Sequence, residues 1–186
     1  WFNEIDECEP TWECDYCKRR MALYADENNP KKEAGVTRLC ASCLHKRVVG
    51  KRVKPKFNDL FMKYNKKELS PCYELSDIDN DEIAIIYGDG NNIGGVIEGF
   101  DYITQMMEFS RNIKNIVEKI VFTAMNEVNI DKIEVVGLGG DDIFVILQGK
   151  KAIKYAIKLI ELYNEEFENY ISKDSSQKST LSVGIA

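Results

Sequence analysis

The sequence predicts an α+β protein, in which a ferredoxin-like βαββαβ domain follows a small zinc-binding module. Apolar strands and amphipathic helices succeed each other in the order β-α-β-β-α-β after residue 82. Two C-x-x-C pairs lie in the first 50 residues. Two acidic, glycine-rich turns fall at strand ends. We therefore expect a zinc module at 1–50, a basic and polar connector at 51–82, and the βαββαβ domain at 83–186, truncated at its C-terminus.

The cysteine spacing indicates a tetrahedral four-thiolate zinc site. The two C-x-x-C pairs are separated by 22 residues, close to the spacing of paired zinc knuckles. One pair alone is also typical of a redox motif, and disulfides fit poorly in a chain without signs of secretion. We expect Cys8 and Cys72 to be reduced thiols and His45 to be a surface residue. The predicted zinc ligands are Cys14, Cys17, Cys40 and Cys43.

Charge is unevenly distributed along the chain. Residues 1–70 hold 15 basic and 11 acidic side chains, whereas residues 71–186 hold 10 and 20. The stretch from Lys46 to Lys67 is densely basic, with Asp59 as its one acid. Such a run is typical of a solvated linker, and it can also follow a phosphate backbone. No apolar stretch approaches the ~20 residues of a membrane span, and no signal peptide is visible, so we expect a cytoplasmic protein without a membrane partner.

The first strand of the main domain ends in a glycine-rich turn. Residues 83–88 predict a buried strand that stops at Gly88, and Asp89 then sits at its C-terminal end. A helical segment is expected at 96–128. The glycines do not fit a dinucleotide-binding G-x-G-x-x-G motif, because Ile93 stands where the third glycine would be. A loop that accommodates phosphate and a plain strand–helix turn both remain open.

The second acidic turn joins two short apolar strands, predicted at 133–138 and 143–148. Its residues are Gly139, Gly140, Asp141 and Asp142. Adjacent carboxylates repel each other unless a cation lies between them, and a divalent metal ion is the usual one. Glycine and aspartate are also ordinary residues of a solvated hairpin turn.

A second amphipathic helix at 150–171 and a last strand at 181–186 complete the predicted domain. In this topology the first strand is central and antiparallel to the third, so Asp89, Asp141 and Asp142 should converge at one edge of the sheet. We expect the first helix to bury Ile103, Met106, Met107, Ser110, Ile113, Ile116, Val117, Ile120 and Val121. We expect the second to bury Ile153, Ala156, Ile157, Ile160, Tyr163, Asn164 and Phe167.

Together these motifs resemble the second palm domain, with its zinc module, of the polymerase-like large subunit of type III CRISPR effector complexes, within the nucleotidyl cyclase and polymerase superfamily. The likeness rests on the 139–142 hairpin paired with the turn at 89–94, and on the double C-x-x-C upstream. It implies binding of ATP with two divalent ions, Mg²⁺ or Mn²⁺, and synthesis of cyclic oligoadenylate messengers in antiviral defence. It also implies RNA and other effector subunits as partners.

The resemblance assigns roles to individual residues. Asp89, Asp141 and Asp142 would be the catalytic metal ligands, with the backbone carbonyl of Gly90 as a further ligand. The family often has Asp where Asn91 stands, and we expect Asn91 to be free to contact the nucleotide. Because one palm supplies one nucleotide site, we expect a second palm, in the same chain or in a homodimer. The nucleotide-binding residues implied are Gly88, Gly90, Asn91, Asn92, Ile93, Gly94, Gly139 and Gly140.

Two alternative functions remain open. A diguanylate-cyclase-like enzyme would have Glu and Phe where this chain has Asp142 and Ile143, and the zinc module is foreign to that family. A catalytically inert scaffold would bind RNA through the zinc module and the basic connector.

Overall fold

The structure, a computed structural model, describes residues 5–7, 12–26, 37–65, 68–70, 72, 74–171 and 179–186. Cys8 lies outside this part of the chain. The chain divides into two compact units, residues 1–56 and 57–186, and each is treated by itself below. The three-part division that the sequence suggests stays a prediction.

The first unit holds a small antiparallel sheet and the start of a long helix. The strands β1 (Ile5–Glu7), β2 (Tyr24–Asp26) and β3 (Thr37–Leu39) pair in the order β1-β2-β3. Helix α1 (Ala41–Asn65) follows and continues into the second unit. The stretch expected as a polar connector is thus helical as far as Asn65, with Pro55 inside the helix. Lysine and arginine are good helix formers, which supports a helix where apolar periodicity is weak.

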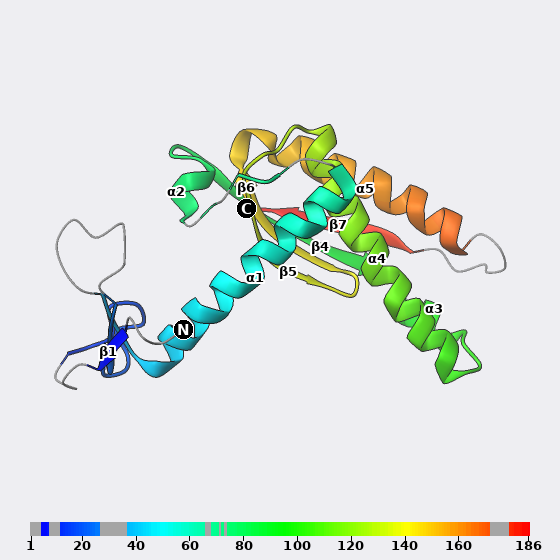
Figure 1. The fold of residues 1–186 in the computed structure, drawn as a ribbon. Helices are drawn as coiled ribbons and strands as arrows, with labels where there is room; N and C mark the ends of the chain where they lie inside the picture. The colour runs from blue at the N-terminus through cyan, green and yellow to red at the C-terminus, as the bar shows by residue number, and fades with distance from the viewer. Residues whose placement is uncertain are drawn as a thin grey trace. The chain divides into compact units, whose positions relative to one another are not determined.

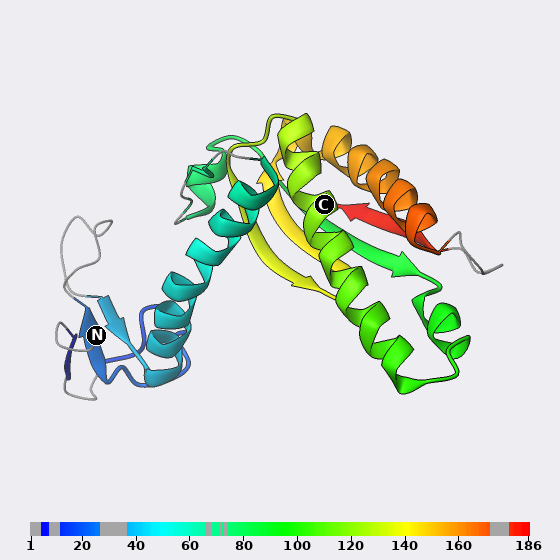
Figure 2. The ribbon, with the colours of Figure 1, turned by 45° about the vertical axis from the view of Figure 1, so that its right-hand side comes forward.

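The second unit is built on a four-stranded antiparallel sheet with β4 and β6 in its centre. Its strands are β4 (Ile83–Asn91), β5 (Ile133–Gly139), β6 (Asp142–Gln148) and β7 (Thr180–Ile185), in the order β5-β6-β4-β7. Helices α4 (Ile103–Glu127) and α5 (Gly149–Ile171) cover one face, and the short helices α2 (Leu75–Ile78) and α3 (Ile93–Glu98) flank β4 in sequence (Figures 1 and 2). The predicted α+β, βαββαβ fold is confirmed. None of the described helices is long and apolar enough to cross a membrane.

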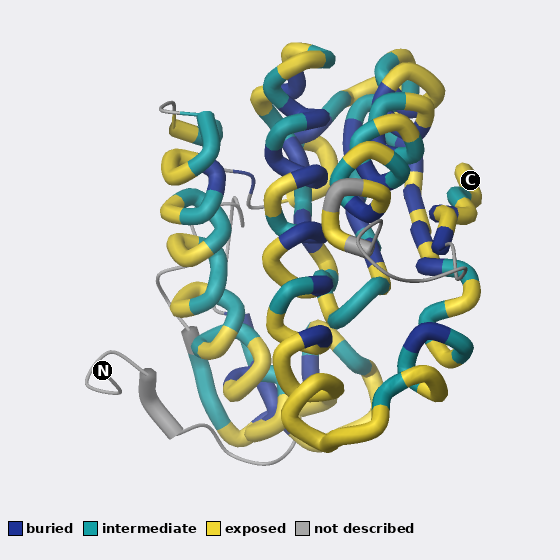
Figure 3. Tube along the Cα trace, turned by 90° about the vertical axis from the view of Figure 1, so that its right-hand side faces the viewer, coloured by how far each residue is buried: buried dark blue, intermediate teal, exposed yellow. Residues whose placement is uncertain are grey.

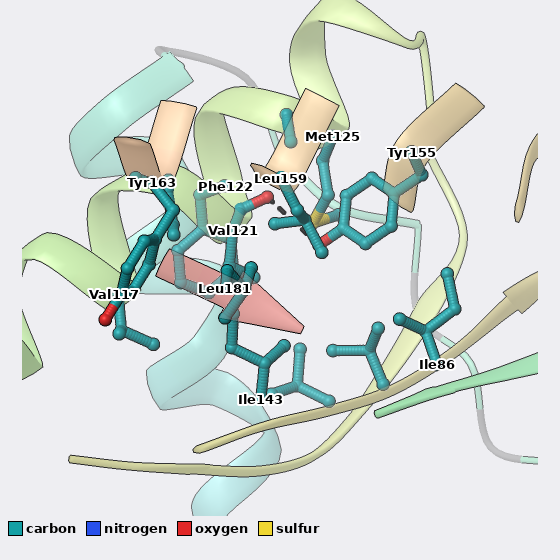
Figure 4. Close-up of a cluster of buried hydrophobic side chains, with 14 of the residues drawn as sticks. Ile86, Val117, Val121, Phe122, Met125, Ile143, Tyr155, Leu159, Tyr163 and Leu181 are labelled. Carbon is teal, nitrogen blue, oxygen red and sulfur yellow. Dashed lines mark hydrogen bonds between the residues drawn. The ribbon is translucent and has the colours of Figure 1, made fainter. Parts of the chain in front are cut away.

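The core of the second unit lies between this sheet and its two long helices. Side chains of α4 and α5 meet those of the sheet there (Figure 4). Strand β4 alternates strictly, because Ala84 and Ile86 are buried while Ile85 and Tyr87 are 41% and 50% exposed. The strand is therefore buried on one face only, so the predicted burial holds for that face and the other face is exposed. The labelled core residues are Ile86, Val117, Val121, Phe122, Met125, Ile143, Tyr155, Leu159, Tyr163 and Leu181.

The segment predicted as one helix at 96–128 is two helices. Helix α3 ends at Glu98, and α4 begins at Ile103 after an extended Tyr102, whose backbone N–H donates to Gln105 Oε1 at 2.9 Å. Gly99 and the extended residue break the helical hydrogen bonding, which apolar periodicity cannot register. The first turns of α4 are exposed (Figure 3), so the prediction that they are core was wrong. The exposed residues include Ile103, Met106, Met107 and Ser110.

Helix α5 lies where it was predicted, with its buried face rotated. Ile153 and Ile157 were expected in the core, yet they are 69% and 52% exposed. The helix instead buries Ala152, Tyr155, Ala156, Leu159, Tyr163 and Phe167. Tyr163 and Phe167 were predicted correctly, whereas Tyr155 and Leu159 are buried in place of the two isoleucines. Tyr155 can be buried since its hydroxyl donates to the carbonyl oxygen of Val121 at 3.2 Å.

Candidate functional site

Four cysteines of the first unit form a compact cluster. Their sulfur atoms all lie within 4.8 Å of one another. The Sγ atoms of Cys17 and Cys40 are 3.8 Å apart, which is about the separation of two ligands in a tetrahedral zinc site with ~2.3 Å Zn–S bonds. Cys14 and Cys40 are buried, whereas Cys17 and Cys43 are partly exposed. The arrangement fits Zn²⁺, and the cluster consists of Cys14, Cys17, Cys40 and Cys43.

Backbone turns hold each pair of cysteines. Lys18, with a positive φ of 51°, donates its N–H to the carbonyl oxygen of Cys14 at 3.0 Å. Cys40 precedes α1, and Leu44 N–H donates to its carbonyl oxygen at 2.9 Å, so Cys43 comes from the first turn of the helix. The side chain of Asp15 joins the two halves, because its Oδ2 accepts from the N–H of Arg38 at 2.7 Å.

The thiols of this cluster ionise unequally. Burial of Cys14 opposes ionisation, but backbone N–H groups of Cys17, Cys40 and Tyr16 outweigh it and lower the pKa of Cys14 to about 6. Hydrogen bonding from the backbone of Cys43 lowers the pKa of Cys40. Burial and the neighbouring thiols raise the pKa of Cys43 to about 12. Backbone donors aimed at sulfur are what a thiolate–metal site needs.

The two acidic turns meet at one rim of the large sheet. Strands β4 and β6 are antiparallel with Gly88 opposite Ile143. Continuing this register by one residue places Asp89 abreast of Asp142, and both are exposed on the face that the helices leave open. Asp89 was expected just beyond its strand. It lies inside β4 instead, paired with Ser182 of β7.

Asp141 reaches the same rim from the side of the sheet that α5 covers. A Cβ atom on Gly90 would lie 2.8 Å from Asp141 Cβ and 2.7 Å from the hydroxyl of Tyr163. Gly90 therefore leaves the space that the Asp141 side chain occupies. Burial raises the pKa of Asp141, and the negative charges of Asp142 and Asp89 raise it further. The three carboxylates are thus close enough to interact, from both faces of the rim.

The hairpin turn itself contains two residues, Gly140 and Asp141, between the paired Gly139 and Asp142. Gly140 has a φ of 63°, and a positive φ at the first central position is the mark of a type II′ turn, which favours glycine there. A Cβ atom on either Gly139 or Gly140 would meet nothing within 4 Å, so the backbone of the turn is open to approach.

Asn91 is occupied by protein contacts. Its Nδ2 donates to Thr180 Oγ1 at 3.0 Å and to Ser182 Oγ at 2.9 Å, and its Oδ1 accepts from Ser182 Oγ at 3.1 Å. Its carbonyl oxygen accepts from Ser179 Oγ at 2.6 Å. In this structure Asn91 fastens β7 to the end of β4, and its contact with a nucleotide stays a prediction.

The remaining loop residues differ in their surroundings. Gly88 faces the core, where a Cβ atom would meet Ile143 Cβ at 3.4 Å, and Ile93 packs against the core. Asn92 has a positive φ of 62° before α3, and a Cβ atom on Gly95 would collide with its Oδ1. A Cβ atom on Gly94 would meet nothing within 4 Å. Gly95 was not predicted as a site residue. The sequence feature that could have pointed to Gly95 is its place in a glycine-rich loop.

Tyr87 is a further residue that sequence reasoning missed. Its hydroxyl donates to Asp142 Oδ1 at 2.8 Å on the open face. This hydrogen bond, followed by the charges of the three aspartates, raises the pKa of Tyr87. An alternating strand could have revealed it, because residues 87 and 89 share a face of any strand.

The donor set at the rim suits a hard divalent cation. Carboxylate and carbonyl oxygens are the ligands of Mg²⁺ and Mn²⁺. Burial raises the pKa of Asp141 most, and a cation would relieve the repulsion from Asp142 and Asp89 that adds to it. The cysteine quartet is the one tight cluster of potential metal ligands in the part of the chain that the structure describes. Asp89, Asp141 and Asp142 are less closely gathered, so their role as metal ligands stays a prediction.

The family comparison concerns the second unit. Residues 82–186 match the family model of the second palm domain of Cas10/Cmr2. Among solved structures, the chain is similar to Csm1–Csm4 cassettes crystallised with pppApA, with AMPPNP and with one ATP, at 16%, 17% and 17% identity and TM-scores of 0.53, 0.52 and 0.50. The likeness covers 68%, 67% and 60% of this chain and 19%, 19% and 18% of theirs. No curated protein matches the chain.

At such identities the solved structures support the fold alone, and the chain spans about a fifth of the length of their Csm1 chains. The family model carries more weight, because it covers more than half of the residues and includes β4, the hairpin and β7. The chain therefore belongs to the Cas10/Cmr2 family, and its residues 82–186 are the second palm domain of that family.

Proposed function

We propose that this chain is a metal-dependent nucleotidyltransferase that binds ATP and makes cyclic oligoadenylate. Its family places it with the nucleotidyl cyclases and polymerases. The observation that carries the proposal is the β4–β6 register, which brings Asp89 abreast of Asp142 with Asp141 in the turn between β5 and β6. Structures of similar fold were crystallised with ATP and with pppApA.

The roles of the residues follow from their positions at the rim. Asp89, Asp141 and Asp142 would hold two Mg²⁺ or Mn²⁺ ions, together with the carbonyl oxygen of Gly90. Such a pair of metal ions, when bound, lowers the pKa of an attacking 3′-hydroxyl and offsets charge on the departing pyrophosphate.

The open backbone at Gly139 and Gly140 would let a triphosphate approach the carboxylates. Asn92, Ile93 and Gly94 would line the phosphate side at the start of α3.

Partners of the chain are part of the proposal. Joining two nucleotides needs a donor and an acceptor, so a second palm, in a longer chain or in a homodimer, would complete the site. Helix α1 bears Lys46, Lys51 and Lys56 on exposed positions, a composition that suits contact with an RNA phosphate backbone. We further propose other CRISPR effector subunits as partners and a cytoplasmic location.

The test uses the whole protein with ATP, Mg²⁺ or Mn²⁺, and cognate RNA. We expect oligoadenylate products that disappear in Asp141→Ala/Asp142→Ala. The matched control is Glu165→Ala/Glu168→Ala, which removes two exposed carboxylates from α5 and should leave product formation unchanged. Both variants should unfold at the temperature of the wild type within a few degrees.

Two outcomes would overturn the proposal in different directions. Conversion of GTP to a cyclic dinucleotide would indicate a diguanylate-cyclase-like enzyme. Binding of RNA without any product, under either metal, would indicate an inert scaffold, for which the basic residues of α1 are the supporting observation.

A further inference from the structure

One carboxylate oxygen of Asp142 is already bound within the protein. Tyr87 and Phe144 stand opposite each other on β4 and β6, and their rings meet edge to face with centroids 6.4 Å apart. From this position the Tyr87 hydroxyl reaches diagonally along the open face and donates to Asp142 Oδ1 at 2.8 Å. The ring of Phe144 therefore restrains the Tyr87 side chain in the orientation in which its hydroxyl donates to Asp142.

The hydrogen bond makes the two carboxylate oxygens of Asp142 unequal as metal ligands. Oδ1 accepts the hydrogen bond from Tyr87, which lies two residues before Asp89 on the same face of β4. Within the part of the chain that the structure describes, Oδ2 has no such side-chain hydrogen bond. A donor that draws on the electron pairs of Oδ1 leaves Oδ2 as the better ligand for a cation at the rim.

Divalent cations differ in what they accept from a carboxylate. Mg²⁺ requires near-octahedral geometry at about 2.0–2.1 Å and takes one oxygen from each carboxylate, keeping several waters. Ca²⁺ is larger, takes about six to eight oxygens, and readily accepts both oxygens of one carboxylate. A residue that occupies one oxygen of a ligating carboxylate therefore opposes the coordination that Ca²⁺ favours.

We propose that Tyr87 is a positioning residue that restricts Asp142 to one oxygen toward the metal site, and so favours Mg²⁺ over Ca²⁺ at that site. The proposal rests on the function proposed above, because it assumes that Asp142 is a metal ligand. It goes beyond that function by assigning the choice between the two cations to a hydroxyl outside the carboxylate set.

The test measures cation selectivity and does not depend on turnover. Mn²⁺ bound to the whole, zinc-loaded protein is followed by electron paramagnetic resonance while Mg²⁺ or Ca²⁺ displaces it. Tyr87→Phe keeps the ring against Phe144 and removes the donor. Tyr170→Phe is the matched control, because Tyr170 Oη also makes an exposed 2.8 Å side-chain hydrogen bond, from Asn112 Nδ2 on α4, far along the chain from the acidic turns.

We expect Tyr87→Phe to raise the affinity for Ca²⁺ relative to Mg²⁺ by about fivefold, the effect of losing one ordinary hydrogen bond. Tyr170→Phe should keep the wild-type ratio. Loss of fold would lower both affinities together and would leave the ratio unchanged, so the ratio separates positioning from a structural role. Thermal unfolding of both variants checks the fold directly.

A variant that lacks the two hairpin carboxylates, Asp141→Asn/Asp142→Asn, separates failure of this inference from failure of the proposed function. If Mn²⁺ binds the wild type no better than Asp141→Asn/Asp142→Asn, the rim is not a metal site and the proposed function fails. If binding depends on the aspartates but Tyr87→Phe has the Ca²⁺-to-Mg²⁺ ratio of the wild type, the metal site stands and the role of Tyr87 is refuted.

Discussion

At the scale of single residues, Gly90 controls where Asp141 lies. The side chain of Asp141 lies against the strand at Gly90, where an added Cβ atom would come 2.8 Å from Asp141 Cβ and 2.7 Å from the hydroxyl of Tyr163. Tyr163 is itself fixed: Ser179 donates its proton to the carbonyl oxygen of Asn91, so the hydroxyl of Tyr163, 3.0 Å from Ser179 Oγ, must be the donor between the two. Neither Asp141 nor Tyr163 can therefore move away from Gly90 without a cost in free energy.

We therefore expect Gly90→Ala to displace Asp141 and to lower the affinity of the rim for Mn²⁺ by tenfold or more. The added methyl group would lie 2.8 Å from Asp141 Cβ, nearer than carbon atoms pack. Gly137→Ala is the control, because a Cβ atom there meets nothing within 4 Å. Mn²⁺ titration of both variants checks the prediction, and equal affinities would show that Asp141 is not placed by Gly90.

A second prediction at this scale concerns the pH dependence of zinc binding. With a pKa of about 6, Cys14 is a thiolate at pH 7 and zinc binding releases no proton from it. Below pH 6 the thiol is protonated, and each zinc ion must displace one more proton. The slope of log zinc affinity against pH should therefore steepen by about one proton below pH 6. Competition with a chromophoric chelator between pH 5 and 8 measures it; a constant slope would contradict the lowered pKa.

At the scale of elements, the rotated face of α5 makes a direct comparison possible. Leu159 is fully buried, whereas Ile157, two residues earlier, is 52% exposed. Leu159→Ala should lower the free energy of unfolding by about 2–5 kcal/mol. Ile157→Ala should lower it by less than about 1 kcal/mol, since half of its side chain already faces solvent. Chemical denaturation measures both, and a reversed order would restore the helix face that the sequence pattern predicted.

The order of the strands and long helices after residue 82 could be predicted from sequence because each of them has a local signal. Apolar runs bounded by glycine marked β4 and the β5–β6 hairpin, and chain order then fixed the sheet through the preferred topology. Helix α1 and the break before Ile103 were missed, since the first has weak periodicity and the second depends on one extended residue.

The candidate site was predictable in part for the same reason. Charged residues at strand ends are visible in sequence, so the three aspartates could be named before any geometry was known. Their partners could not. The bonds of Tyr87 and Asn91 depend on which residue stands opposite in the sheet, and that register is a long-range property with no local signal.

At the scale of the whole molecule, the two units have separate apolar cores. The core described for the first unit is small and consists largely of the cysteines of the four-cysteine cluster with Leu39 and Leu44. The core of the second unites α4, α5 and the sheet, and includes Phe61 of α1. Among the residues that the structure describes, the small core of the first unit contains few apolar side chains, so its stability should depend on zinc.

Removal of zinc should therefore unfold the first unit and leave the second intact. We expect one zinc ion per chain in the purified protein. After chelation, amides of Cys14 to Tyr24 and of β3 should exchange with solvent freely, whereas those of β4 and β6 keep their protection because their hydrogen bonds lie in the other core. Cys14→Ser should reproduce this pattern without a chelator, and hydrogen exchange with mass spectrometry resolves the two regions. Simultaneous loss of protection in β4 and β6 would mean that α1, which runs through both units, transmits unfolding from one core to the other.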